Sequence, residues 1–173
     1  MRTARFLVGL LLATAFQILG IHLWGPFLLV IDLFLVLAVA ASLDHGPVGS
    51  MLAGSVAGLV QDALTGGLFG LNGFADTFVA WSASRLKQRI VIQRPLEVGL
   101  LFSLAAALQQ TLLVLLQFLM LPGGELPGLE VMALRMVTAG AIGMTLFVFL
   151  QRSRQKLESW RERRRRRLAI DID

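Results

Sequence analysis

Apolar residues occur in six long runs along the chain, and the short segments between these runs contain glycine, proline or charged residues. Each run has about the 17 to 25 residues that an α-helix needs to cross the hydrocarbon core of a bilayer. The pattern therefore predicts an all-α integral membrane protein with six transmembrane helices, at residues 6–24, 27–43, 48–64, 68–84, 96–121 and 129–150.

The connections between the runs are short and rich in helix breakers, such as Gly25-Pro26, Gly46-Pro47 and Gly66-Gly67. Turns of this kind join antiparallel neighbours in a helical bundle. We therefore expect one compact transmembrane domain over residues 1–150, followed by a basic tail over residues 151–173.

The positive charges are distributed unevenly about the predicted bundle. Fifteen of the 16 Lys and Arg residues fall in segments on one side, and the remaining one, Arg135, lies inside the last run. Only an even number of crossings places both basic ends of the chain on the same side. Because cytoplasmic segments of membrane proteins carry the excess of Lys and Arg, we expect both termini in the cytoplasm.

The composition excludes a soluble domain, since 56% of the residues are hydrophobic and only 16% are charged. A chain of 173 residues has too little interior to hide that much apolar surface from water. The basic tail, with its run Arg163–Arg167, lies beside lipid, so we expect anionic headgroups rather than nucleic acid as its partner. The tail is either a topology anchor or a docking site for an acidic cytoplasmic protein.

The third run carries a ladder of small residues. Gly46, Ser50, Gly54 and Gly58 recur every four residues and lead into Asp62 on nearly the same helical face. Small residues let helix backbones approach closely inside a membrane, where the hydrophobic drive between helices is weak. The ladder favours packing within the bundle over contact with a partner protein, and both interpretations remain open from the sequence.

Three ionisable residues are expected inside the spans at similar depths, in the outer half of the bundle: Asp32, Asp76 and Arg135. Charged side chains are costly at such depths and are usually paired. We therefore predict that Arg135 pairs with Asp32, with Asp76 or with both. A structural ion pair is the simplest interpretation, and a small-ligand pocket or a proton or ion path are the alternatives.

No pattern in the chain indicates catalysis. The chain contains no cysteine, and its two histidines are expected on opposite sides of the membrane. There is no Gly-x-Ser-x-Gly sequence and no phosphate-binding loop. We therefore expect a protein that is not an enzyme, with no catalytic residue, cofactor or metal site.

Residues 54–74 resemble the central signature of the rod shape-determining protein MreD family. That signature is Gly-x3-Gly-Leu-x2-Asp, then a glycine-rich turn and Gly-Leu-Asn. The family places an aspartate directly after the proline of the second span, whereas here Phe27 follows Pro26 and the nearest aspartate is Asp32. The resemblance implies a partner-binding or packing role for the signature residues Gly54, Gly58, Asp62, Gly66, Gly67, Gly70 and Asn72.

The resemblance also implies a function and a fold. Members of the family are scaffold subunits of the bacterial cell-elongation complex that bind MreC, and through it are linked to MreB, RodA and a class B penicillin-binding protein. Their fold is similar to that of the substrate-binding subunits of energy-coupling-factor transporters. The alternative function is therefore a vitamin-transporter subunit, with an outward pocket lined by Asp32, Asp76, Arg135 and Asn72.

Overall fold

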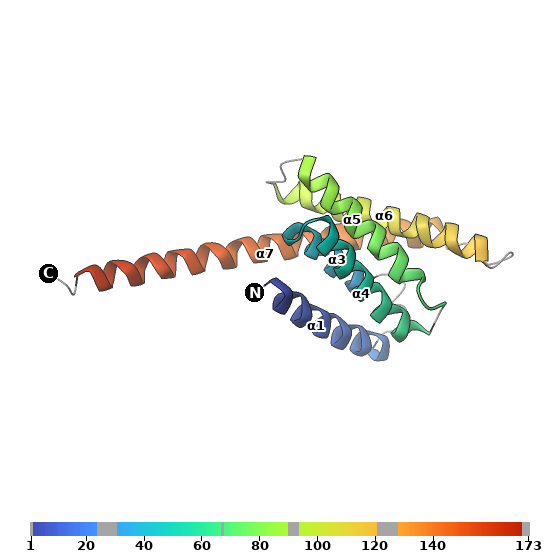
Figure 1. Cartoon of the computed structure of the whole chain (residues 1–173), viewed down its shortest axis with the longest axis horizontal. Helices are drawn as coiled ribbons and strands as arrows, with labels where there is room; N and C mark the ends of the chain where they lie inside the picture. Colours follow the sequence, from blue (N-terminus) through green and yellow to red (C-terminus); the bar gives the residue numbers. More distant parts are fainter. Residues whose placement is uncertain (1, 24–30, 67, 90–93, 121–127, 171–173) are drawn as a thin grey trace.

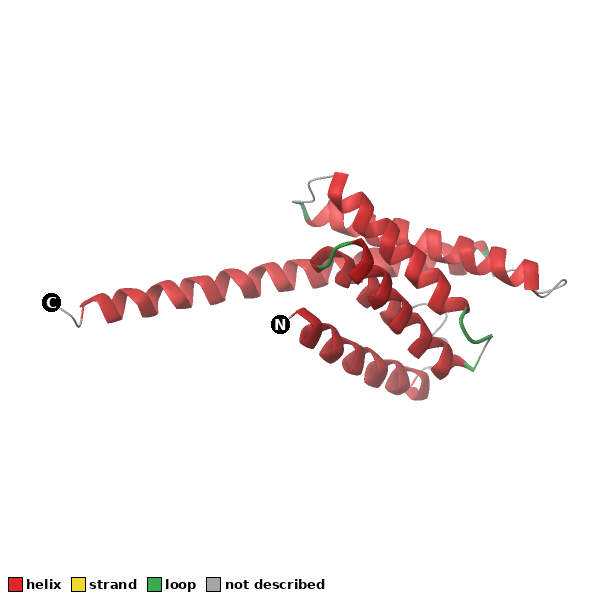
Figure 2. Cartoon of the chain, viewed as in Figure 1, coloured by secondary structure: helices red, strands yellow, loops and turns green. Residues whose placement is uncertain are grey.

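The computed structural model describes residues 2–23, 31–66, 68–89, 94–120 and 128–170. The described part contains six α-helices and no strand, which confirms the predicted all-α class (Figure 2). The helices are α1 (Arg2–Leu23), α3 (Leu33–Asp44), α4 (Pro47–Thr65), α5 (Leu71–Arg89), α6 (Pro95–Met120) and α7 (Leu129–Ile170).

Consecutive helices run in alternating directions, so the amino and carboxyl termini of the chain lie toward the same end of the bundle (Figure 1). The turn between α3 and α4 lies at that end, and so does the end of α5. The turn between α4 and α5 lies at the opposite end. This arrangement gathers the basic segments at one end of the molecule, as the charge pattern predicts.

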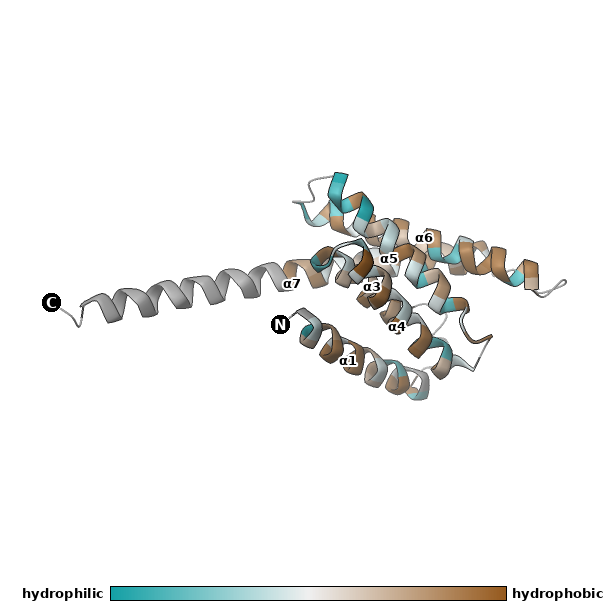
Figure 3. Ribbon diagram, viewed as in Figure 1, coloured by the Kyte–Doolittle hydropathy of each residue, from teal (hydrophilic) through white to brown (hydrophobic). Residues whose placement is uncertain are grey.

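Three of the helices are long and apolar enough to cross a membrane, over Thr3–Gly20, Pro95–Met120 and Leu129–Phe149. Large apolar side chains cover their outer surfaces, and Figure 3 shows the hydrophobic residues along α1 and α6. Helices α4 and α5 each have 19 residues, but their glycine, serine and other polar residues lower their hydropathy. The described part of the chain thus has six helices, three of which qualify as membrane spans by length and apolarity, and six membrane crossings stay a prediction.

The second predicted span is wrong at its outer end. Helix α3 has 12 residues and begins at Leu33, so it is about 18 Å long, well short of the roughly 30 Å hydrocarbon core. Asp32 has an extended backbone conformation, and its carboxylate accepts a hydrogen bond from the Leu35 amide at 2.9 Å. Asp32 therefore caps α3 instead of lying within a continuous helix over residues 27–43.

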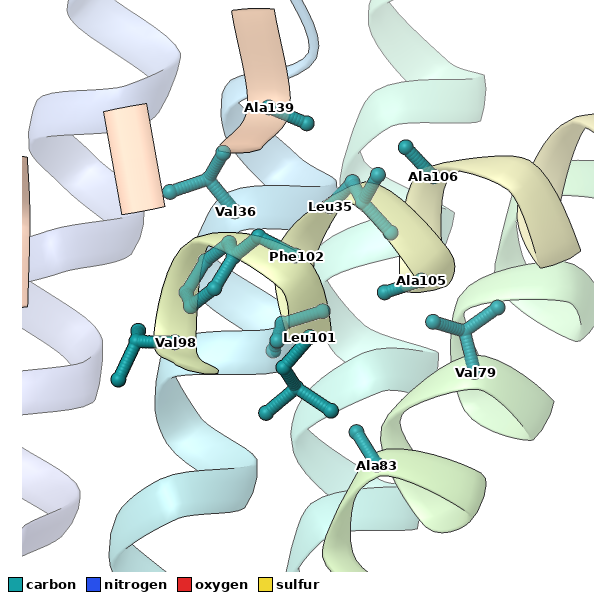
Figure 4. Close-up of a cluster of buried hydrophobic side chains, with 11 residues drawn as sticks. Leu35, Val36, Val79, Ala83, Val98, Leu101, Phe102, Ala105, Ala106 and Ala139 are labelled. Atoms are coloured by element: carbon teal, nitrogen blue, oxygen red, sulfur yellow. The ribbon is translucent and has the colours of Figure 1, made fainter. Parts of the chain in front are cut away.

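The hydrophobic core lies where α3 is surrounded by α5, α6 and α7. Leu35 and Val36 of α3 meet Phe102 of α6 and Val79 of α5, and Ala139 of α7 closes the cluster (Figure 4). All of these side chains are at most 5% exposed. The short helix α3 is therefore the buried centre of the bundle.

Gly54 and Gly58 of the small-residue ladder pack inside the bundle, whereas Gly46 is exposed at the start of α4. A Cβ atom built on Gly54 would lie 2.4 Å from the Asp76 carbonyl oxygen, and one on Gly58 would lie 2.4 Å from the Asn72 carbonyl oxygen. Both contacts are with the backbone of α5, which runs directly against α4. The ladder residues Gly54 and Gly58 are therefore packing residues, and this face is not free for a partner helix.

Helices α6 and α7 meet through a second set of small residues. A Cβ atom on Gly140 would lie 2.3 Å from the Ser103 hydroxyl, and one on Gly143 would lie 2.3 Å from the Phe102 ring. The Ser103 hydroxyl donates a hydrogen bond to the Met136 carbonyl at 3.0 Å. This close contact fastens α7 to α6.

Helix α7 has 42 residues and continues through the predicted domain boundary at residue 150 as far as Ile170. Only its first 21 residues are apolar enough to span a membrane. The remaining part projects away from the other helices (Figure 1). The last helix thus includes most of the basic tail, and the division into two domains stays a prediction.

Candidate functional site

Asp62 organises the turn between α4 and α5. Its carboxylate accepts hydrogen bonds from the backbone amides of Gly70 at 2.8 Å, Asn72 at 3.2 Å and Gly73 at 3.1 Å. The Asn72 side-chain amide donates a fourth bond at 2.8 Å. Asp62 is only 2% exposed, so these four donors replace the water that its carboxylate lacks.

The position of Asp62 also suits its charge. The first amides of α5 point at its carboxylate, and the amino-terminal end of a helix attracts negative charge. Gly66 ends α4 in the left-handed conformation, with a φ of 67°, and Gly70 has a φ of 100°. Residues with side chains rarely adopt these angles, so the two glycines allow the chain to reverse tightly around Asp62.

A second polar group lies deeper in the bundle and joins four helices. We call it the interior cluster: Asp32 before α3, Gln61 in α4, Asp76 in α5 and Gln109 in α6. Gln61 Nε2 and Gln109 Nε2 both donate to Asp32 Oδ2 at 3.0 Å. Gln109 Nε2 also donates to Asp76 Oδ1 at 2.8 Å. One amide nitrogen thus bridges two carboxyl groups, and each member of the cluster is at most 8% exposed.

Several oxygen atoms of the interior cluster have no hydrogen-bond partner within the described structure: Asp76 Oδ2, Gln61 Oε1 and Gln109 Oε1. Asp76 and Gln109 are fully buried. A buried polar atom without a partner costs free energy, and such atoms in a native protein often mark a site for an ion, a water molecule or a ligand. The interior cluster is therefore the candidate functional site.

Asp32 and Asp76, which the sequence analysis expects at similar depths in the bundle, both contact Gln109. Arg135 is a half-buried residue of α7. Its pairing with either carboxyl group stays a prediction, since the hydrogen bonds that the structure shows to these groups come from amides. Asn72, which the transporter alternative places in the same pocket, instead contacts Asp62. Gly67 lies outside the described residues.

Sequence reasoning missed the glutamines. Gln17, Gln61, Gln109 and Gln110 are all at most 7% exposed, and at least one side-chain atom of each lacks a hydrogen-bond partner among the described residues. Their signal was present in the sequence, because an amide inside an apolar helix needs a polar partner there. From the sequence we considered only the charged residues at these depths and therefore predicted an ion pair.

The described residues contain no group of three or more His, Cys, Asp and Glu side chains that could hold a metal ion. The site therefore has no ligand set of the kind that zinc and other transition metals use.

Comparison with known protein families identifies the family of this chain. The family model described as rod shape-determining protein MreD matches residues 1–153, which is most of the chain. The chain belongs to the MreD family. It is therefore a rod shape-determining membrane protein by family. Among curated proteins and among solved structures no match was found, so the expected likeness to energy-coupling-factor subunits has no structural support.

The structure gives the residues of the MreD-like signature a physical role. Gly54 and Gly58 let α4 touch the backbone of α5, and Asp62 binds the first turn of α5. Gly70 and Asn72 supply donors to Asp62. The signature of this MreD family member therefore specifies a tightly packed pair of helices and the turn that joins them.

Proposed function

We propose that this MreD family member is a non-enzymatic scaffold that binds MreC in the bacterial inner membrane and supports lateral peptidoglycan synthesis. The family assignment over residues 1–153 carries the proposal. The rigid pairing of α4 with α5 supports it, because a scaffold must present a surface of fixed shape. Through MreC the protein is linked to MreB, RodA and a class B penicillin-binding protein.

The outer turn between α4 and α5 is the surface that we propose for MreC. Gly54 and Gly58 of the small-residue ladder lie against α5, so they do not offer a free face. At the turn, Phe69 is 71% exposed and Leu68 is 45% exposed. Both residues lie immediately before Gly70 and Asn72, whose backbone amides the Asp62 carboxylate binds. An exposed aromatic residue on a rigid support is a favourable anchor for a partner, because little conformational entropy is lost on binding.

The orientation follows from the charges. Both termini and the basic end of α5 lie at one end of the bundle, and we assign this end to the cytoplasm. The turn that carries Phe69 then faces the periplasm, where the juxtamembrane segment of MreC emerges. The basic tail of α7 is within reach of anionic headgroups on the cytoplasmic side.

Co-purification tests this function directly. Tagged full-length protein is extracted from its native membrane in mild detergent, and the recovered MreC is quantified by mass spectrometry. The Phe69→Ala variant is compared with Phe118→Ala, which removes a phenyl ring with the same 71% exposure from α6. We expect Phe69→Ala to lower MreC recovery roughly tenfold, as for an anchor worth about 1.4 kcal/mol, and Phe118→Ala to leave it unchanged.

Two failures would have different meanings. If the unchanged protein recovers no MreC, the scaffold function is wrong. If the unchanged protein recovers MreC and Phe69→Ala recovers as much, the function stands and the assignment of the surface is wrong.

A further inference from the structure

The two carboxyl groups of the interior cluster accept hydrogen bonds from uncharged donors. Asp32 and Asp76 lie within hydrogen-bond distance of the same atom, Gln109 Nε2, at 3.0 and 2.8 Å. Among the described residues, the donors to these two carboxyl groups are the neutral amides of Gln61, Gln109 and the Leu35 backbone. Two carboxyl groups this close, each at most 8% exposed, can both be ionised only when a positive charge lies beside them.

The unsatisfied atoms of the cluster point to the same conclusion. Asp76 Oδ2, Gln61 Oε1 and Gln109 Oε1 are buried oxygen atoms without a hydrogen-bond partner among the described residues. The two amides turn their nitrogen atoms to the carboxyl groups, and their oxygen atoms are left as buried acceptors on the same two side chains. All three atoms can only accept hydrogen bonds or coordinate a cation unless a carboxyl group is protonated.

We propose that the interior cluster binds one alkali-metal cation, such as Na⁺ or K⁺, between Asp32, Asp76 and the side-chain oxygens of Gln61 and Gln109. The predicted pairing of Arg135 is compatible with this site, because one guanidinium group balances only one of two carboxylates. The bound ion contacts side chains from α4, α5 and α6 and the residue that caps α3. It therefore joins four segments of the bundle inside the membrane.

The ligand chemistry favours an alkali cation over other metal ions. Soft and borderline metals prefer thiolate and imidazole ligands, and the chain has no cysteine. Mg²⁺ demands octahedral geometry and usually keeps several water molecules, whereas the residues here are buried. Carboxylate and amide oxygens in a dry helical interior resemble the side-chain and backbone oxygens that hold Na⁺ in membrane transporters.

The test uses full-length protein purified in mild detergent without alkali salts. Thermal unfolding is followed in NaCl, KCl, LiCl or choline chloride at a fixed ionic strength, with MgCl₂ as a divalent comparison. We expect a saturable rise of the unfolding midpoint in NaCl or KCl, by about 5 °C or more when the cation is a hundredfold above its Kd. Choline is too large for the site, so it should give no rise.

Two carboxyl-to-amide variants locate the ion. Asp76→Asn keeps the size of the side chain and removes one charge of the interior cluster, so its midpoint should no longer respond to the cation. Glu130→Gln makes the same chemical change at an exposed residue of α7 and should keep the full response. Equilibrium binding of radioactive ²²Na⁺ to the unchanged protein, with competition by unlabelled K⁺, should give one site per chain.

The proposal is overturned if the midpoint is equal in alkali and choline salts and no ²²Na⁺ binds. It is also overturned if Asp76→Asn responds like Glu130→Gln, because the ion then binds elsewhere. A response to Mg²⁺ in preference to Na⁺ and K⁺ would overturn the assignment to alkali cations. If Asp76→Asn does not fold, the ²²Na⁺ measurement on the unchanged protein still decides.

Discussion

The contact of α4 with α5 at Gly58 should be the most sensitive point of the fold to a single added methyl group. A Cβ atom there would lie 2.4 Å from the Asn72 carbonyl oxygen, 2.6 Å from its carbon and 2.7 Å from the Gly73 Cα atom. All three are backbone atoms, so no side chain can move aside to make room. The Gly58→Ala substitution must separate the two helices.

The expected cost follows from two opposing terms. Alanine favours a helix over glycine by about 1 kcal/mol. Overpacking a well-packed interior typically costs about 1 to 3 kcal/mol, and contacts with backbone raise this toward the upper end or beyond. We expect Gly58→Ala to lower the free energy of unfolding by about 2 kcal/mol. For a chain of this length that corresponds to a fall of about 4 to 8 °C in the unfolding midpoint.

A matched control is available in α6. Gly99→Ala adds the same methyl group to a helix, but its Cβ atom would meet its nearest neighbour at 3.5 Å, which is ordinary van der Waals contact. Thermal unfolding of both purified variants in the same detergent measures the difference. If Gly58→Ala is as stable as Gly99→Ala, the close approach of α4 to α5 is wrong, and so is the packing role assigned to the ladder.

Two further substitutions test the polar residues. Asp62→Ala leaves four donors of the outer turn without their acceptor, so we expect it to lower the free energy of unfolding by about 4 kcal/mol and to expose the turn to proteolysis. Protease resistance equal to that of the unchanged protein would contradict the role of this carboxylate. Arg135→Leu removes the predicted counter-charge of Asp32 and Asp76, and breaking a buried pair costs about 3 kcal/mol or more. The pairing is wrong if thermal unfolding of this variant matches that of the unchanged protein.

The helices were largely predictable from the sequence because apolar length and helix breakers are local features. Gly46-Pro47 begins α4 and Gly66 ends it, as the turn signals indicate. The exception is α3, whose predicted start lies six residues before the observed one at Leu33. Hydropathy alone could not show that Asp32 lies outside the helix, and only the cap that Asp32 forms marks the start of α3.

The interior cluster could not be predicted in the same way, because its members come from positions 32, 61, 76 and 109 and meet only after the helices pack. From the sequence we assumed that each buried carboxylate has a cationic partner. A glutamine side chain is neutral, yet it can donate hydrogen bonds to two carboxyl groups. Gln109 does so from the centre of an apolar helix. The amide satisfies hydrogen bonds but brings no positive charge, so both carboxyl groups can be ionised only with cations beside them.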